Sequence, residues 1–442
     1  MFHPLVFSVN KNRNWTPVRS LTTRVPTRGL PDRKNNLKHF SELPLSPYLQ
    51  ERLAVAEFSV PTPVQAAALP PALQGKDVVA TAQTGTGKTL GFLIPVMERL
   101  LQQKAAGIAA LVLVPTRELA MQVADQYEAL RGAKLPRAAV AVGGLSERDQ
   151  LNAIRRGARV IVATPGRLED FLERGLVNFR DLQILVLDEA DRMLDMGFLP
   201  SLRRIASALP ANRQTMCFSA TMEASVAHLV SNYTKSPVRV ALGSTLKPSE
   251  NVRVQAFEVS DSEKQDVLHR LLAKETGRCL VFARTKRGTE RLAKRLTHEG
   301  FAAAAIHGDR SQSQRIAALA GFQQGRYRVL VATDLASRGI HVEDIAHVIN
   351  YDLPQVAEDF IHRVGRTGRA GGRGVASTLF GRDQAKDLRD LERTLGIRIE
   401  RKSIQSEFSA EGDRAAISVN LSAISAATRS IVALPGEILQ NG

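Results

Sequence analysis

Ala82-Gln83-Thr84-Gly85-Thr86-Gly87-Lys88-Thr89 is the stretch of this sequence that decides the fold. It fits the phosphate-binding pattern G-x-x-x-x-G-K-[ST] with Ala82 in place of the first glycine. A short apolar strand precedes it, and a segment whose apolar residues recur at helical intervals, Leu90–Leu101, follows it. A strand that turns through glycines into a helix directs several backbone N–H groups at one point. We expect Lys88 to reach the β- and γ-phosphates of a nucleotide and Thr89 to hold Mg²⁺. Taken alone, a glycine-rich turn without a ligand is the alternative.

An acidic motif at the end of another apolar run supports the nucleotide interpretation. Ile184–Leu187 is followed by Asp188-Glu189-Ala190-Asp191. The carboxyl ends of parallel strands form the edge where such sheets bind ligands. We predict that Asp188 binds Mg²⁺ through water and that Glu189 orients or deprotonates the attacking water. The alternative is a solvated helix N-terminus. Together the two motifs indicate a nucleoside triphosphatase.

The composition favours a protein that binds nucleic acid. The chain has 442 residues, enough for two domains plus tails, and a net charge of +16. Such a charge favours a polyanionic partner, although a generally basic surface is the alternative. No apolar stretch reaches the ~18–20 residues of a membrane span. Cys217 and Cys279 lie in apolar runs, which indicates buried thiols in a reducing compartment and excludes a zinc site, so we expect a cytoplasmic protein without membrane contact.

The two ends of the chain lack an apolar period. Residues 1–36 carry seven Lys and Arg against the single acid Asp32, which predicts a disordered basic arm. An auxiliary RNA-binding arm, an organellar transit peptide and an upstream start codon that is not used all remain open. Residues 397–442 are close to neutral and rich in Ser and Ala, so we predict a tail without a folded module or a basic RNA-binding surface.

Apolar strands alternate with amphipathic helices in two sets, which is typical of parallel sheets with crossover helices. We predict a first domain over 37–243, a Pro-containing linker over 244–252 and a second domain over 253–396. The expected strands of the first domain are 77–81, 110–115, 139–142, 159–163, 184–188, 214–219 and 238–242. Those of the second domain are 254–259, 279–283, 303–306, 328–332, 346–350 and 375–380.

Three further segments have two interpretations each. Phe58 to Gln65 supplies an aromatic ring and an amide suited to an adenine edge, or is a Pro-bracketed turn with a core Phe. Ser219-Ala220-Thr221 links the nucleotide site to a partner domain, or caps the next helix. Arg366 and Arg369 share one helical face at i, i+3 and suit one triphosphate across a cleft, or belong to a solvated basic turn.

In this order the segments resemble the DEAD-box family of ATP-dependent RNA helicases from about Leu37 to Leu395. The Asp-Glu-Ala-Asp run at 188–191 spells the family's Walker B motif. Further matches are Phe58 to Gln65, Ala82 to Thr89, Pro115 to Ala120, Gly143-Gly144, Thr164 to Arg167, Ser219 to Thr221, Val281 to Thr285, Gln312 to Arg315, Val331 to Gly339 and His362 to Arg369. Asp191 to Phe198 and His307 to Asp309 look most like the bacterial RhlE-type branch.

The resemblance implies an α/β fold of two tandem RecA-like parallel-sheet domains, with helices on both faces and a cleft between them. Its cofactors are ATP and Mg²⁺, and its activity is RNA-stimulated ATP hydrolysis coupled to domain closure and local unwinding or remodelling of RNA. The implied catalytic residues are Lys88, Asp188, Glu189, His362, Arg366 and Arg369. ATP would contact Phe58, Gln65, Ala82, Gln83, Thr84, Gly85, Thr86, Gly87, Lys88, Thr89 and His341, and Mg²⁺ would contact Thr89 and Asp188.

RNA is the partner that the resemblance implies, held through phosphates and 2′-hydroxyls with little reading of sequence. The implied contacts are Pro115, Thr116, Arg117, Gly143, Gly144, Thr164, Pro165, Gly166, Arg167, Arg284, Thr285, Arg315 and Thr333. Ser219, Thr221 and Asp191 would couple the two sites. RNA-decay or ribosome-assembly proteins are the further partners expected for a bacterial branch member.

Two positions depart from the family pattern. Glu57 stands where a glycine usually precedes the aromatic residue of the adenine motif, which would stiffen that turn. His341 stands where an aspartate usually accepts a ribose hydroxyl, and a neutral imidazole accepts one hydrogen bond whereas a protonated one accepts none. We expect weaker ATP coupling, dependent on pH, which an aspartate at position 341 would restore.

Two rival functions remain open at this point. The first is an ATP-gated RNA clamp, which would hold RNA with little turnover of ATP. The weaker ATP coupling expected from His341 is consistent with such a clamp. A DNA helicase or translocase of the same superfamily is disfavoured by the Asp-Glu-Ala-Asp spelling and by the Phe58 and Gln65 motif.

Overall fold

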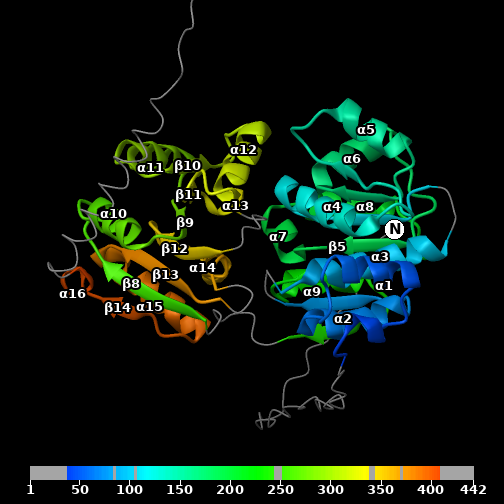
Figure 1. The fold of residues 1–442 in the computed structure, drawn as a ribbon, viewed down its shortest axis with the longest axis horizontal. Helices are drawn as coiled ribbons and strands as arrows, with labels where there is room; N and C mark the ends of the chain where they lie inside the picture. The colour runs from blue at the N-terminus through cyan, green and yellow to red at the C-terminus, as the bar shows by residue number, and fades with distance from the viewer. Residues whose placement is uncertain are drawn as a thin grey trace, which may run out of the picture. The chain divides into compact units, whose positions relative to one another are not determined.

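The computed structural model describes residues 37–82, 86–103, 107–242, 251–337, 344–368 and 372–408. The predicted basic arm, most of the predicted linker and most of the predicted tail lie outside these residues. Within the described ranges, no helix has both the length and the apolar character that crossing a membrane requires. The described residues form two seven-stranded sheets, each with its own helices (Figure 1).

The first sheet and its helices, here called the N-terminal lobe, lie between residues 37 and 242. The strand order is β3-β4-β2-β5-β6-β1-β7, with all pairs parallel. The strands are β1 (Val78–Thr81), β2 (Ala110–Leu113), β3 (Ala139–Ala141), β4 (Val160–Ala163), β5 (Ile184–Leu187), β6 (Gln214–Ser219) and β7 (Val238–Ala241). The helices are η1 (Phe40–Glu42), α1 (Pro47–Val55), α2 (Pro63–Leu73), α3 (Lys88–Gln102), α4 (Arg117–Arg131), α5 (Glu147–Arg155), α6 (Pro165–Glu173), α7 (Ala190–Asp195), α8 (Leu199–Ser207) and α9 (Ala224–Tyr233).

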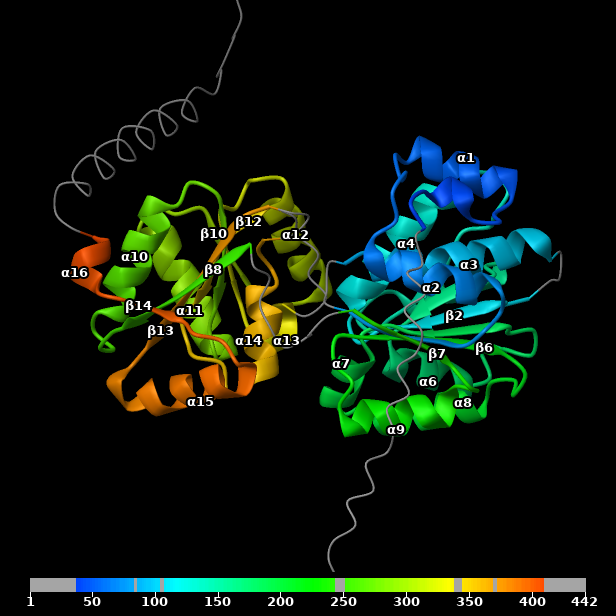
Figure 2. The ribbon, with the colours of Figure 1, turned by 90° about the horizontal axis from the view of Figure 1, so that it is seen from below.

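Both faces of the first sheet are covered, which explains why its strands are apolar throughout. Successive side chains of a strand point to opposite faces, so Ile184 and Val186 of β5 join one core cluster and Leu185 and Leu187 join the other. Helices α1 to α4 cover the first face, and α6 to α9 cover the second. Figure 2 shows these two layers, with α1 to α4 above the sheet and α8 and α9 below it.

The second sheet and its helices, here called the C-terminal lobe, have the order β10-β11-β9-β12-β13-β8-β14, again all parallel. The strands are β8 (Val252–Glu258), β9 (Arg278–Phe282), β10 (Ala303–Ile306), β11 (Val329–Ala332), β12 (Ile345–Asn350), β13 (Gly374–Phe380) and β14 (Glu400–Lys402). The helices are α10 (Lys264–Lys274), α11 (Lys286–His298), α12 (Gln312–Gln323), α13 (Asp334–Ser337), α14 (Ala357–Val364), η2 (Arg382–Gln384), α15 (Ala385–Leu395) and α16 (Ile404–Glu407).

All thirteen strands expected from the sequence are present within two residues of their predicted bounds. The boundary at residue 396 is wrong, because the second sheet continues into the predicted tail. Strand β14 pairs with β8, and Ile399 and Phe408 are buried in the two cores of this lobe. Strand β8 also begins at Val252, one residue inside the predicted linker.

Candidate active site and nucleic-acid interface

The strand order divides the carboxyl edge of the first sheet into two halves. The segments predicted to contact nucleotide follow β5 and β1, and the segment predicted to couple the two sites follows β6, which lies between them. The segments predicted to contact RNA follow β3, β4 and β2, which are also neighbours. Strands β2 and β5 pair with each other, so the two halves meet at the middle of the sheet. Because all pairs are parallel, every one of these segments emerges at the same edge.

The phosphate loop joins β1 to α3 as predicted. Gly87 precedes α3 with φ of 84°, a left-handed conformation that glycine adopts without strain. A Cβ atom at Gly87 would lie 2.5 Å from Gln65 Nε2, so glycine is also required for space. Lys88, the first residue of α3, is 6% exposed and donates from Nζ to the Ala82 carbonyl at 2.9 Å. Residues 83–85 of the predicted loop lie outside the described residues.

Gln65 connects the adenine motif to this loop. Its Oε1 accepts from the Thr62 N–H at 2.8 Å, and its Nε2 donates to the Gly87 carbonyl at 2.8 Å. Phe58 is half-buried and packs against the core of the N-terminal lobe. The turn that presents Phe58 is a Schellman motif after α1, in which the Phe58 N–H donates to the Leu53 carbonyl at 2.9 Å. Gln65 thus lies beside the phosphate loop, and the contact of Phe58 and Gln65 with adenine stays a prediction.

Three carboxylates gather where β5 ends. Asp188 and Glu189 are 3% and 5% exposed, and Asp191 is 6% exposed. Burial raises the pKa of the Asp188 carboxyl to about 7; Lys88 opposes this, whereas Glu189 and Asp191 act in the same direction as burial. A nearby cation stabilises the ionised form of a carboxyl, and this stabilisation is largest where burial disfavours that form. The donor set of Asp188 and the Thr89 hydroxyl, beside the Lys88 ammonium, therefore fits Mg²⁺ with the phosphates of ATP.

Asp191 is bonded to the segment that follows β6. Its Oδ2 accepts from the Ala220 and Thr221 N–H groups, both at 2.9 Å, and its own N–H donates to Ser219 Oγ at 3.3 Å. The next helix, α9, begins only at Ala224 with Glu223 as its N-cap residue. The helix-capping interpretation of Ser219 and Thr221 is therefore wrong, because their polar groups hold the acidic motif instead.

The predicted RNA segments of the N-terminal lobe lie against one another. Thr116 caps α4 by accepting from the Leu119 N–H at 3.3 Å, which places Arg117 at the start of that helix. A Cβ atom at Gly144, whose φ is 76°, would lie 2.1 Å from Arg117 Nη1, and one at Gly143 would lie 3.2 Å from Nη2. The two glycines thus leave room for the guanidinium beneath the loop.

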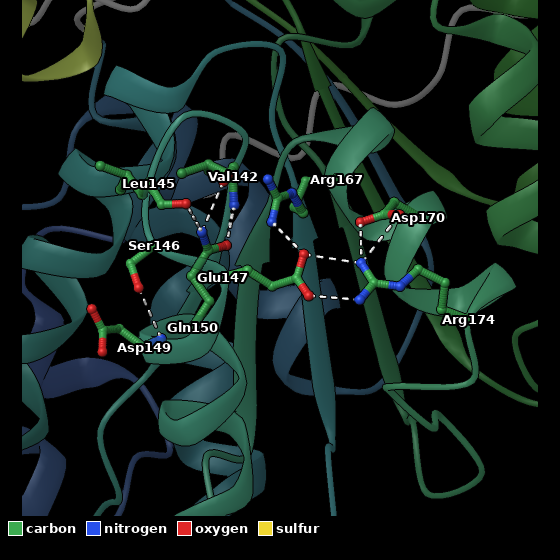
Figure 3. A network of polar contacts seen from close by, with 9 residues as sticks. All are labelled: Val142, Leu145, Ser146, Glu147, Asp149, Gln150, Arg167, Asp170 and Arg174. Carbon is green, nitrogen blue, oxygen red and sulfur yellow. Dashed lines mark hydrogen bonds and ion pairs between the residues drawn. The ribbon is translucent and has the colours of Figure 1, made fainter.

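Arg167 is held by residues that the sequence did not reveal (Figure 3). Glu147 Oε2 lies 3.3 Å from Arg167 Nη1 and accepts from Arg174 Nη1 at 2.9 Å. Arg174 Nη1 also donates to Asp170 at 3.2 Å, and the Arg167 guanidinium carbon lies 5.3 Å from the Phe171 ring centre. The side chain of Arg167 is 18% exposed, so this network leaves a partly accessible guanidinium beside Thr164 and Gly166.

Gln150 is a second residue that sequence reasoning missed. It is 6% exposed, accepts from the Val142 N–H at 2.8 Å and donates to the Val142 carbonyl at 3.0 Å and the Leu145 carbonyl at 3.3 Å (Figure 3). It thereby fixes the loop that contains the two glycines. In the sequence Gln150 adjoins Leu151 in a charged helix, and no pattern separates it from a solvated glutamine.

In the C-terminal lobe, Arg284 and Thr285 follow β9, and Thr333 follows β11. The Arg284 N–H donates to Asp352 at 2.8 Å, and Thr285 caps α11 by accepting from the Gly288 N–H at 3.0 Å. Arg315 lies on α12, which follows β10, with Nη2 3.5 Å from the Ala336 carbonyl. Strands β10, β11 and β9 are neighbours, so these predicted RNA residues share one half of the second sheet.

The arginine-rich motif is only partly helical. Helix α14 ends at Val364, and Arg366 lies in the turn that follows, where its Nε donates to the His362 carbonyl at 3.2 Å. The helical face predicted for Arg366 and Arg369 is therefore wrong, because the chain leaves the helix at Gly365. Arg363 is 3% exposed and pairs with Asp334 at 2.5 Å. Arg369 and His341 lie outside the described residues.

Comparisons with known proteins agree with this geometry. Residues 62–229 match the DEAD/DEAH box helicase family model, and residues 263–371 match the helicase conserved C-terminal domain. DEAD-box ATP-dependent RNA helicase 14 of Arabidopsis thaliana is 43% identical over 81% of this chain and 59% of its own length. DEAD-box ATP-dependent RNA helicase CshA of Geobacillus kaustophilus is 40% identical over 82% of this chain and 78% of its own length. This chain thus spans less than two thirds of the plant relative.

Solved structures show the same two-sheet fold. Dbp5 of S. cerevisiae, bound to RNA and ADP BeF3, has a TM-score of 0.76 at 29% identity over 87% of this chain and 99% of that one. Mss116p, bound to ssRNA and AMP-PNP, has a TM-score of 0.75 at 28% identity over 81% of this chain and 77% of that one. Each sheet with its helices is accordingly a RecA-like domain. From the matched segments and these relatives, the chain belongs to the DEAD-box family of ATP-dependent RNA helicases.

Proposed function

We propose that this chain is an RNA-dependent ATPase that uses ATP hydrolysis to unwind short RNA duplexes or remodel RNA–protein complexes locally. The observation that carries the proposal is the divided edge of the first sheet. The segments predicted to contact nucleotide and those predicted to contact RNA follow strands in different halves of this sheet, and the two halves meet at β2 and β5. The relatives Dbp5 and Mss116p, whose structures hold RNA with a nucleotide analogue, support the same assignment.

ATP with Mg²⁺ supplies a transferable phosphoryl group whose negative charge must be neutralised during transfer. We assign Lys88 and the start of α3 to the phosphates, and Thr89 with Asp188 to the metal ion. Glu189 orients the attacking water and accepts its proton. Arg366, Arg369 and His362 belong to the C-terminal lobe and stabilise charge at the phosphoryl group, an effect worth ~10³–10⁵ in rate where arginine supplies it.

RNA would be bound through its backbone by cations and N–H groups of both lobes. Arg117, Arg167 and Arg284 provide guanidinium groups, and Gly143-Gly144 provides a backbone surface without side chains. Because these groups would contact phosphates rather than bases, we expect RNA binding that depends little on the RNA sequence and weakens steeply as the salt concentration rises. The contacts of Asp191 with Ser219 and Thr221 would transmit the state of the nucleotide site to the rest of the lobe.

Some finer assignments belong to the same proposal. The Asp191 to Phe198 and His307 to Asp309 sequences support the bacterial RhlE-type branch. The two buried thiols, Cys217 and Cys279, support a reducing compartment such as the cytoplasm. RNA-decay or ribosome-assembly proteins are the proposed protein partners, and the segment over 244–251 is the proposed linker between the lobes.

Steady-state ATPase measurements test the proposed function. We expect RNA to stimulate ATP hydrolysis strongly and DNA of the same sequence to stimulate it little. Lys88→Ala should abolish the stimulated rate, and Glu189→Gln should lower it by roughly 10²–10⁴-fold to a residual rate that can still be measured. Arg203→Met, at an exposed arginine of α8, should leave the rate unchanged. Equal stimulation by DNA would indicate a DNA translocase, and a slow rate with long-lived RNA complexes would indicate an RNA clamp.

A further inference from the structure

Arg192 is a buried cation for which the assigned nucleotide site gives no role. It lies on α7, immediately after the acidic motif, and its relative exposure is 0%. Within the part of the chain that the structure describes, Nε, Nη1 and Nη2 have no hydrogen-bond partner. Removing a guanidinium from water costs several kcal/mol unless a countercharge compensates it. The position of Arg192 therefore requires a carboxylate nearby.

Glu189 is the carboxylate that meets this requirement. Its Oε2 lies 3.5 Å from Arg192 Nη1, with both side chains buried, and this oxygen has no hydrogen-bond partner among the described residues. The other carboxylates of the motif are bonded elsewhere. Asp191 accepts from Ala220 and Thr221, and Asp188 Oδ1 accepts from the Glu189 N–H at 3.0 Å. Arg192 is thus paired with the one acid of the motif that must keep a free oxygen for water.

The backbone fixes this pairing. Glu189 has φ of 51° and ψ of 52°, a left-handed conformation that is costly for a residue with a Cβ atom. It directly precedes α7, and the Met193 N–H donates to its carbonyl at 3.1 Å, so the first turn of the helix begins there. Glu189 and Arg192 stand three residues apart across this first turn, and their side chains meet there.

We propose that Arg192 is a positioning residue that holds the Glu189 carboxylate in the orientation required to accept a proton from the attacking water. The proposal rests on the proposed ATPase function. In a buried site the attraction between two unit charges is stronger than in water, so it restricts the rotamers of Glu189. A displacement of about 1 Å of a reacting group is enough to lower a rate about 100-fold.

Kinetics of two substitutions test the role. Arg192→Met keeps a long, unbranched side chain like the apolar stem of arginine but removes the charge. Arg192→Lys keeps the charge. We expect Arg192→Met to lower kcat at saturating ATP and RNA by roughly 10–100-fold, with the KM values for ATP and RNA changed less than about 2-fold. Arg192→Lys should restore part of kcat. Arg203→Met, at an exposed arginine of α8, is the matched control.

A double-substitution cycle distinguishes positioning from a general structural role. If Arg192 acts through Glu189, adding Arg192→Met to Glu189→Gln should cause no further loss of kcat. In the nucleotide-free protein, Glu189→Gln should lower Tm by roughly 5 °C because it leaves a buried cation uncompensated, and adding Arg192→Met should recover part of that loss.

The two proposals fail in different ways. A wild-type protein without RNA-stimulated hydrolysis would overturn the proposed function, whereas additive Tm shifts in the nucleotide-free cycle would overturn the pairing of Arg192 with Glu189. The positioning role would also be overturned by an Arg192→Met variant that keeps kcat within twofold of the wild type, by equal changes in kcat and both KM values, or by kinetic losses that multiply.

Discussion

The buried Asp188 carboxyl makes the stability of the nucleotide-free protein depend on pH. Burial raises its pKa from 3.8 to about 7 in the folded protein. A carboxyl whose pKa is higher in the folded state than in the unfolded state stabilises the fold fully at pH values below its unfolded-state pKa. This stabilisation is lost as the pH rises through the folded-state pKa. Ionising Asp188 at pH 8 therefore costs about 4 kcal/mol, at about 1.4 kcal/mol for each pH unit between the two pKa values.

The substitution Asp188→Asn removes this ionisation and should stabilise the nucleotide-free protein. At pH 5 Asp188 is already protonated in the folded state, so only the ionisation of the unfolded chain favours unfolding. We expect the advantage of the variant in free energy of unfolding to grow by about 2–3 kcal/mol from pH 5 to pH 8. For a lobe of this size that corresponds to roughly 5–10 °C in Tm.

Calorimetry in a chelating buffer without nucleotide measures this difference. The wild type and Asp188→Asn are compared from pH 5 to pH 8, with Asp149→Asn, which removes an exposed charge on α5, as the matched control. A gap in Tm between the wild type and Asp188→Asn that stays constant over this range would refute the reasoning. It would mean that Asp188 is ionised in the folded protein well below pH 7.

Three further substitutions follow from single contacts. Glu57→Gly should raise the free energy of unfolding by about 0.5–1 kcal/mol, because Glu57 has a strained φ of 61° at the C′ position after α1 and glycine adopts this angle without strain. Calorimetry measures the change, and a lower stability of the variant would show that Glu57 is not strained. Gly144→Ala should displace Arg117 and weaken RNA binding while leaving nucleotide binding intact, as fluorescence titrations of both ligands would show. Gln150→Leu should lower the free energy of unfolding by about 1–3 kcal/mol, because it leaves the Val142 N–H and carbonyl unpaired, and it should also weaken RNA binding. An unchanged RNA affinity would show that the loop held by Gln150 takes no part in RNA binding.

Much of this fold could be predicted because its signals are local. Buried parallel strands are short apolar runs, and the phosphate loop and the acidic motif follow two of them. Strand β14 was missed because Glu400–Lys402 has no apolar residue and is a strand only through its pairing with β8. The end of α14 was missed because the residues after Val364 keep a helical spacing in sequence, and the chain turns at Gly365.

The candidate site could be predicted where a motif spells it and not where side chains from separate elements meet. Lys88, Asp188 and Asp191 are readable from their motifs, and the structure brings them to one edge. The network of Glu147 and Arg174 around Arg167 joins residues up to 27 positions apart, and its members look like ordinary surface charges in the sequence. Such contacts depend on how α5 and α6 pack, which the sequence pattern does not specify.

The divided edge of the N-terminal lobe also bears on how such proteins diversify. Because β3 and β4 lie at one margin of the sheet and β1 lies near the other, the loops after β3 and β4 can change without disturbing the phosphate loop. We expect a chimera that exchanges residues 139–174 with a relative to acquire the donor's affinity for the RNA backbone and to keep this chain's own nucleotide segments. The architecture thus allows the strength of RNA binding to vary without a change in the nucleotide site.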